Sequence, residues 1–202
     1  MKTFIAMALL CTTASAQSVS NKMEAGVLLS GTFLKEIGSR DVGAGTSAIG
    51  FGGRFVHKAL PYTDFETDIL IWPNNQATAG TWIQGLFGVK IGKRFDRVGL
   101  FLKVRPGFMH FRKDPFGASK AGPGPGPLMT GNWASSTEAS ADLGGVIEYY
   151  TVRGMVLRFD LGDTVLRYGR RTVVLSQLQP PIERGGFTTH NWQGSFGLSF
   201  PF

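Results

Sequence analysis

The chain has 202 residues, and its 21 Lys and Arg residues exceed its 14 Asp and Glu residues, which gives a formal net charge of +7. This length allows one domain or two small ones. The basic residues are scattered and form no Lys/Arg run, so we expect no nucleic-acid partner. The single cysteine, Cys11, lies in the N-terminal segment, so the rest of the chain can form neither a disulfide nor a thiolate metal site. We therefore expect no metal and no cofactor.

The N-terminal segment predicts a cleaved secretory signal peptide. A basic start at Lys2 precedes an apolar run from Phe4 to Leu10, and the segment ends in Ala14-Ser15-Ala16. Small residues of this kind mark the cleavage site of exported proteins. Cleavage after Ala16 divides the chain into a signal peptide over residues 1–16 and one domain over residues 17–202.

Two other kinds of membrane attachment compete with this interpretation. A lipid anchor on Cys11 is disfavoured because Leu10 is bulkier than the small residue expected before such a cysteine. No later segment has the unbroken apolar run of about 18 residues that a transmembrane helix needs. If the exported chain crosses a membrane, it must do so as strands.

Apolar residues alternate with small, polar or charged residues in successive segments, which is the period of a β-strand. Connections between these segments are alternately long and short, and both termini lie on the side of the short turns, as an even-stranded up-and-down barrel requires. Pro106 removes a ladder donor from the fifth strand, so we expect a bulge or kink there. The predicted strands are Met23–Leu34, Thr46–Lys58, Tyr62–Trp72, Thr81–Arg94, Val98–Arg112, Thr137–Tyr150, Gly154–Tyr168 and His190–Phe202.

The last predicted strand has the clearest pattern. Trp192, Phe196, Phe200 and Phe202 share one face, and small polar residues share the other. A free apolar strand promotes aggregation in water, whereas in a closed membrane barrel its edge pairs with the first strand and its apolar face meets lipid. This strand, with its terminal Phe202, resembles the closing strand of bacterial outer-membrane β-barrels. The resemblance implies that the barrel-assembly machinery recognises it.

Alternation alone does not say which face is inside, because a soluble lipocalin-like carrier has the same period with apolar residues inward. Glycines such as Gly52, Gly88 and Gly144 share the parity of the charged residues, which suits the narrow lumen of an eight-stranded barrel. The charges on that face are balanced, as a poorly hydrated interior requires. The predicted lumen network comprises Arg54, Lys90, Lys103, Arg105 and Arg158 with Glu66, Asp68, Asp142, Glu148 and Asp160.

Aromatic residues gather near the predicted strand ends, as in the interfacial belts of membrane-spanning barrels. On the long-loop side these are Trp72, Trp82, Trp133 and Trp192, and on the short-turn side they are Tyr62, Phe95, Tyr149, Tyr150 and Phe202.

Together these observations predict an all-β fold, an eight-stranded antiparallel up-and-down transmembrane β-barrel with a polar lumen filled by side chains. The pattern is similar to that of small outer-membrane barrels such as the membrane domain of outer-membrane protein A. The resemblance implies a monomer in the bacterial outer membrane, with periplasmic termini, extracellular long loops and outer-membrane lipid around it.

No local motif indicates catalysis, and we expect no enzymatic activity. Some eight-stranded outer-membrane barrels are lipid A deacylases or acyltransferases that use His with Ser and an acidic residue near the outer rim. A match of this kind would need His190 with Ser195, or His110 with Ser136 and Glu138. A wide pore is disfavoured because eight strands leave a lumen that side chains fill.

The predicted long loops carry a basic excess that could contact lipopolysaccharide phosphates. The leading hypothesis is therefore a structural or surface-interaction barrel. The alternatives are a lipid A-modifying enzyme, a secreted lipocalin-like ligand carrier and a narrow gated pore. The basic loop residues of this hypothesis are Lys113, Lys120, Arg170, Arg171 and Arg184.

Overall fold

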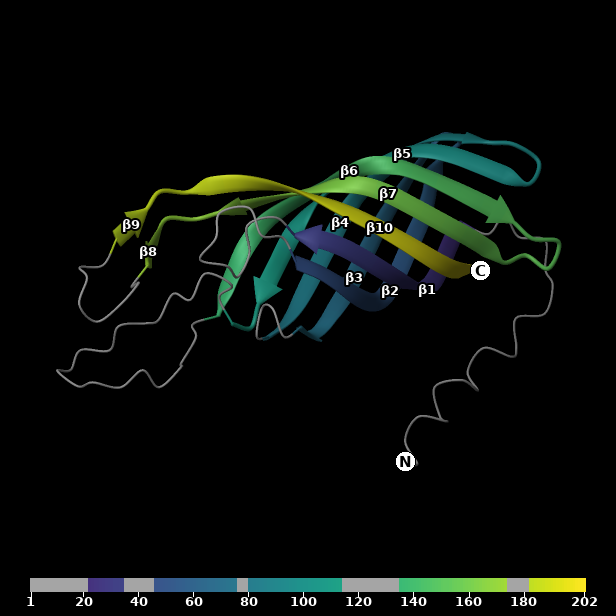
Figure 1. Ribbon diagram of the computed structural model, residues 1–202. Helices are drawn as coiled ribbons and strands as arrows, with labels where there is room; N and C mark the ends of the chain where they lie inside the picture. Colours follow the sequence, from purple (N-terminus) through teal and green to yellow (C-terminus); the bar gives the residue numbers. More distant parts are fainter. Residues whose placement is uncertain (1–21, 35–45, 76–79, 114–134, 174–181) are drawn as a thin grey trace, which may run out of the picture.

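The computed structural model describes residues 22–34, 46–75, 80–113, 135–173 and 182–202, and in these ranges the chain forms a closed antiparallel β-barrel (Figure 1). The eight barrel strands follow one another around the wall in chain order, and the first pairs with the last. The predicted fold class is confirmed. The strands are β1 (Met23–Leu34), β2 (Thr46–Leu60), β3 (Thr63–Asn75), β4 (Gly80–Arg94), β5 (Val98–Phe111), β6 (Ser136–Tyr150), β7 (Val156–Tyr168) and β10 (Phe187–Pro201).

Three of the predicted features lie outside the described residues: the signal peptide over residues 1–16, Lys120 and Trp133. Within the described ranges, no helix is long and apolar enough to cross a membrane.

The barrel closes between β1 and β10, whose pairing runs from Glu24 opposite Pro201 to Phe33 opposite Trp192. Beyond this ladder, the backbone N–H of Phe202 donates to the carbonyl of Met23 at 2.9 Å. The terminal phenylalanine therefore continues the closing ladder, and its side chain is exposed on the outer face. Closure pairs the edge of β1 with β10 from Trp192 to Pro201.

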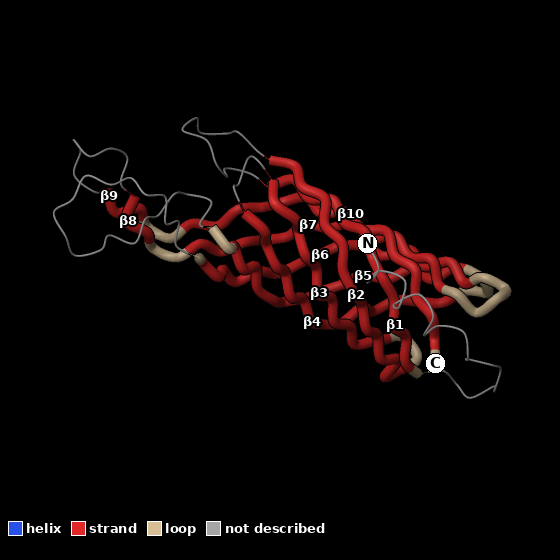
Figure 2. The backbone as a smooth tube through the Cα atoms, turned by 90° about the horizontal axis from the view of Figure 1, so that it is seen from below, coloured by secondary structure: helices blue, strands red, loops and turns tan. Residues whose placement is uncertain are grey.

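The two ends of the barrel differ in their connections. At one end, here called the turn end, short turns join β2 to β3, β4 to β5 and β6 to β7, and both ends of the described chain lie there (Figure 1). At the other end, the long-loop end, β10 extends beyond its ladder with β1, and the short strands β8 (Arg171–Val173) and β9 (Ile182–Arg184) project beyond the ends of β7 and β10 (Figure 1). Figure 2 shows the slanted strands of the wall and this projecting pair. In the turn after β6, Gly154 adopts a φ of 79°, a conformation that favours glycine.

Three local predictions are corrected. The connection predicted over residues 73–80 is shorter, because β3 continues to Asn75 and β4 begins at Gly80. The last predicted loop contains a small antiparallel pair, β8 (Arg171–Val173) with β9 (Ile182–Arg184). At Pro106 the expected bulge does not form, because the ladder with β4 keeps its register, but the ladder is interrupted there between the pairs Leu86–Gly107 and Val89–Val104. The proline pairs with Ala141 of β6 on the other side, and the ladder remains in register.

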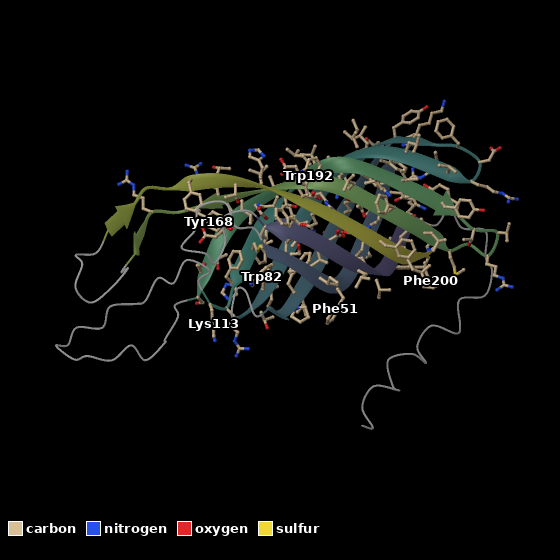
Figure 3. The ribbon with its side chains drawn as sticks, in the orientation of Figure 1. Phe51, Trp82, Lys113, Tyr168, Trp192 and Phe200 are labelled. Atoms are coloured by element: carbon tan, nitrogen blue, oxygen red, sulfur yellow. The ribbon has the colours of Figure 1, made fainter. Side chains whose placement is uncertain are left out.

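The wall has the reverse polarity of a water-soluble protein. Outward side chains are large and apolar, and Ile49, Phe51 and Leu102 are 71 %, 54 % and 72 % exposed. Phe51 and Phe200 lie on the outer face in Figure 3. Charged residues on the same strands point inward and are buried. A lipocalin-like carrier would have the opposite arrangement, with apolar residues around an internal cavity.

Inward glycines allow neighbouring strands to approach closely. A Cβ built on Gly52 would lie 1.9 Å from the carbonyl oxygen of Ile69, and one on Gly144 would lie 2.1 Å from that of Leu161. Both carbonyls belong to the adjacent strand. These glycines therefore lie on the inward face, as predicted from the sequence. They make room for the backbone of the neighbouring strand as well as for a narrow lumen.

Candidate functional site: the filled lumen

All ten charged side chains of the predicted lumen network lie in the interior, and none is more than 4 % exposed. They come from six strands, β2 through β7, at inward positions set by the alternation. Each makes at least one ion pair with another member of the set, so the ten side chains form one connected network.

Asp68 joins two arginines at the centre of this network. The guanidinium of Arg54 donates to both of its carboxylate oxygens, at 2.7 and 2.6 Å. Arg105 donates to the same carboxylate at 2.5 Å and to Asp142 through Nε at 2.9 Å. Bidentate pairs of this kind are among the strongest hydrogen bonds in proteins and fix the orientation of both groups.

A second set of pairs crosses the lumen to β7. Arg158 donates to Glu66 of β3 at 2.6 and 3.1 Å, and to its strand neighbour Asp160 at 2.7 Å. Asp160 also accepts from Arg54 of β2 at 3.0 Å. Because β7 is adjacent to neither β2 nor β3 in the wall, these contacts span the interior.

Toward the turn end, the network includes residues absent from the predicted set. Lys90 contacts Glu148 and lies 3.3 Å from Asp64, and Asp64 also binds Arg94. Tyr150 donates to Glu148 at 2.7 Å and accepts from Arg94 at 3.1 Å. Tyr150 therefore faces the lumen and does not belong to the predicted outer belt. Tyr150 is two residues from Glu148 on β6, so both side chains point to the same face. Asp64 likewise lies on the face of Glu66 and Asp68 on β3.

An uncharged polar layer follows on the long-loop side of the ions. Gln193 of β10 and Gln84 of β4 exchange hydrogen bonds at 3.2 and 3.3 Å across the lumen. Thr164 donates to Gln193 at 2.8 Å, and Ser30 and Ser195 lie 2.8 Å apart. These amides and hydroxyls satisfy one another, as buried polar groups must.

Aromatic side chains fill the long-loop end of the lumen. Trp72 and Trp82 are 0 % and 1 % exposed, with ring centroids 6.3 Å apart. Phe111 contacts Trp82 edge to face at 5.5 Å and lies 6.4 Å from Tyr168. Trp82 and Tyr168 are labelled at this end in Figure 3. We call these four residues, with Leu34, Leu70, Met109 and Leu166, the aromatic cluster.

The aromatic cluster corrects the predicted outer belt. Trp72 and Trp82 were expected at the lipid interface, yet they share the inward parity of Asp68 and Gln84. Of the described tryptophans, Trp192 alone faces outward, at 60 % exposure. On the turn side, Tyr62, Phe95, Tyr149 and Phe202 are exposed as predicted.

Neither of the two residue groupings that a lipid A-modifying enzyme would need comes together in the structure. His190 faces outward and lies 2.6 Å from Asp163, whereas Ser195 faces the lumen and bonds Ser30. His110 is 2.8 Å from the hydroxyl of Thr137 on the outer face, whereas Glu138 points inward and accepts from the backbone of Gly169. In the described ranges, no cluster of His, Cys, Asp and Glu could hold a metal ion.

The predicted basic loop residues stand at the long-loop end as far as they are described. Lys113 follows β5 and is exposed (Figure 3), and Arg170 is exposed just beyond β7. Arg171 and Arg184 are backbone partners in the β8–β9 pair.

Comparison with solved structures supports the fold. The chain is 13 % identical to Neisserial surface protein A, with a TM-score of 0.50 over 90 % of this chain and 97 % of that one. The N-terminal β-barrel domain of Pseudomonas aeruginosa OprF is 9 % identical, with a TM-score of 0.44 over 89 % and 97 %. The attachment invasion locus protein Ail of Yersinia pestis is 10 % identical, with a TM-score of 0.43 over 89 % and 99 %. At such identities the likeness shows the fold alone.

Comparisons with protein-family models and with curated proteins find no match. The chain has the fold of the eight-stranded outer-membrane barrels.

Proposed function

We propose that the protein is an integral barrel of the bacterial outer membrane with a structural or surface-interaction role and a lumen that does not conduct. The observation that carries this proposal is the reversed polarity of the wall. Exposing a continuous apolar surface to water would promote association, whereas lipid solvates it. A closed barrel also satisfies every backbone group of its wall, which the hydrocarbon interior demands.

The filling of the lumen argues against a pore. Ion pairs span the interior between β2, β3 and β7, and the glutamines bridge β4 and β10. The aromatic cluster adds a tightly packed layer at the long-loop end. An ion would have to separate several charge pairs and displace buried rings to pass. Separating buried pairs is costly, so we expect no conductance at ordinary membrane potentials.

The orientation follows from the connections. The termini and short turns would lie in the periplasm, and the long connections would lie outside the cell. In this orientation the exposed Lys113 and Arg170 face the outer leaflet, where lipopolysaccharide carries phosphates. The closing strand β10 would engage the barrel-assembly machinery before closure.

A lipid A-modifying enzyme is the second candidate, and the contact between His190 and Asp163 favours it. A carboxylate that orients a histidine is a familiar element of general-base catalysis. Both residues lie on the outer face near Trp192, within reach of a membrane lipid. No serine or cysteine nucleophile contacts His190 among the described residues, so we assign the pair a structural role and expect no catalysis.

Outer-membrane fractionation with electrophoresis of boiled and unboiled samples tests the proposal. We expect the protein in the detergent-extracted outer membrane and faster migration of the unboiled form. Recovery in the aqueous fraction without detergent would contradict it. Mass spectrometry of lipid A after expression should show no change, and a mass difference that disappears in His190→Ala would establish the enzyme instead.

A further inference from the structure

A hollow of about 400 Å³ lies at the long-loop end, where β7 ends and β10 begins. Its volume is within the range of about 300–1,000 Å³ typical of small-molecule sites. The residues that line it include the end of β7, the start of β10 and the segments just beyond them: Arg167, Tyr168, Arg170, Gly186, Phe187 and Thr188. All of them lie in the described part of the chain.

The walls of the hollow combine an aromatic pair with a close approach of backbone. The rings of Tyr168 and Phe187 stack with centroids 4.9 Å apart. A Cβ on Gly186 would lie 3.0 Å from the carbonyl oxygen of Tyr168, so glycine lets the two segments come together. Tyr168 is 1 % exposed and its ring belongs to the aromatic cluster, so this pair closes the hollow on the lumen side.

The charge of the hollow is positive. Arg167 and Arg170 are exposed, and among the side chains that the structure describes no carboxylate lines the hollow. Glu138 approaches Gly169 from the lumen side and accepts its backbone N–H at 3.2 Å. Arg54, Arg105 and Arg158 differ, because each binds two or more carboxylates. Within the described ranges, neither arginine of the hollow forms an ion pair.

The height of the hollow matches a lipid headgroup. Trp192 is exposed on β10, and exposed tryptophans of membrane barrels lie at the interface. Thr188 precedes it by four residues, which is about 14 Å along the strand at about 3.4 Å per residue. At the strand tilt of about 45° usual for such barrels, the hollow begins about 10 Å higher than Trp192. In the proposed orientation this step leads outward from the apolar band, to the level of the outer-leaflet phosphates.

We propose that the hollow binds a phosphate group of lipopolysaccharide, with Arg167 and Arg170 donating to its oxygens. This inference rests on the proposed outer-membrane location. The planar fork of a guanidinium matches phosphate oxygens in a bidentate manner, and both arginines line the hollow.

Binding to vesicles tests the inference. The full barrel in detergent is mixed with phosphatidylcholine vesicles that contain bisphosphorylated lipid A, or lipid A from which both phosphates have been removed. The double variant Arg167→Gln/Arg170→Gln should bind the phosphorylated vesicles about tenfold more weakly than the parent protein. The matched control Arg97→Gln/Arg153→Gln removes two exposed charges at the turn end and should bind like the parent.

Three results would overturn the inference: unchanged binding by the first variant, an equal loss in the control, or equal binding to both kinds of vesicle. Competition by inorganic phosphate at the same concentration as lipid A would identify a free-anion site instead of a lipid site. Heat-dependent migration separates this test from the proposed function. If all variants still migrate differently when boiled and unboiled, and lipid A binding is unchanged, the hollow is not a lipid site. The proposal that the protein is a membrane barrel would be unaffected.

Discussion

The two halves of the lumen are filled by different chemistry. The turn-side half is held by directional pairs between buried ions, and the long-loop half is held by the aromatic cluster. Buried ions must be matched in number and position, because an unpartnered charge is far more costly than a lost apolar contact. Rings tolerate local change better, since neighbouring side chains can partly fill a space. The difference implies that single substitutions should be most damaging in the ionic half.

The largest effect is expected at Asp68. Asp68→Asn keeps the size of the side chain but removes the charge shared by Arg54 and Arg105. Leaving two buried guanidiniums short of one carboxylate should lower the free energy of unfolding by about 3–5 kcal/mol. Urea titration of the protein in lipid vesicles, followed by tryptophan fluorescence, measures this loss.

The matched control is Asp163→Asn, which removes the carboxylate of the exposed pair with His190. It should change the free energy of unfolding by about 0.5 kcal/mol or less, as surface pairs do. If the two variants lost equal free energy of unfolding, burial would not determine how much each carboxylate contributes to stability.

The ionic half was also the easier half to predict from the sequence. Alternation assigns each residue to a face, and charge balance then identifies the inward face, so the ten predicted residues all lie in the lumen, although Asp64 and Arg94 of the same network were not predicted. The partners were not predictable. Glu66 and Arg158 are 92 residues apart, and their meeting depends on the relative height of β3 and β7, which the stagger of the closed barrel sets. Residues on one face can pair in many ways until that stagger is known.

The aromatic half was misread for a physical reason. Position near a strand end places a tryptophan at the membrane interface only when its side chain points outward. Trp72 and Trp82 lie near strand ends, but their side chains point inward. Their spacing from Asp68 and Gln84, an even number of residues along each strand, already indicates this. The β8–β9 pair could not be predicted in this way, because strands of three residues are too short to show an alternating pattern in the sequence.

Truncating one ring of the aromatic cluster should have the next largest effect. Trp82→Ala removes contacts with Trp72 and Phe111 and leaves a cavity, so a loss of about 3 kcal/mol in the free energy of unfolding is expected. Trp192→Ala removes an outward ring and should cost less than half as much. The same urea titration, followed by circular dichroism, compares the two variants. A larger loss for Trp192 would mean that the belt, and not the cluster, stabilises this end.

The smallest of these effects concerns the backbone of the ionic half and uses two adjacent glycines of β6. Gly144 faces inward opposite Lys103, and a Cβ there would lie 2.1 Å from the carbonyl oxygen of Leu161. Gly145 faces outward, and a Cβ there would meet nothing within 4 Å. Gly144→Ala must push β6 and β7 apart and should destabilise the barrel by about 2 kcal/mol.

Gly145→Ala should stay within about 0.5 kcal/mol of the parent, because the methyl group enters open space. Both substitutions restrict the unfolded chain equally, so their difference isolates the contact in the folded wall. The approach of the strands also sets the distance across the lumen over which Arg158 reaches Glu66. If the two variants were equally stable, the close approach of β6 and β7 would not be required, and the ionic pairs would tolerate a wider lumen than the structure shows.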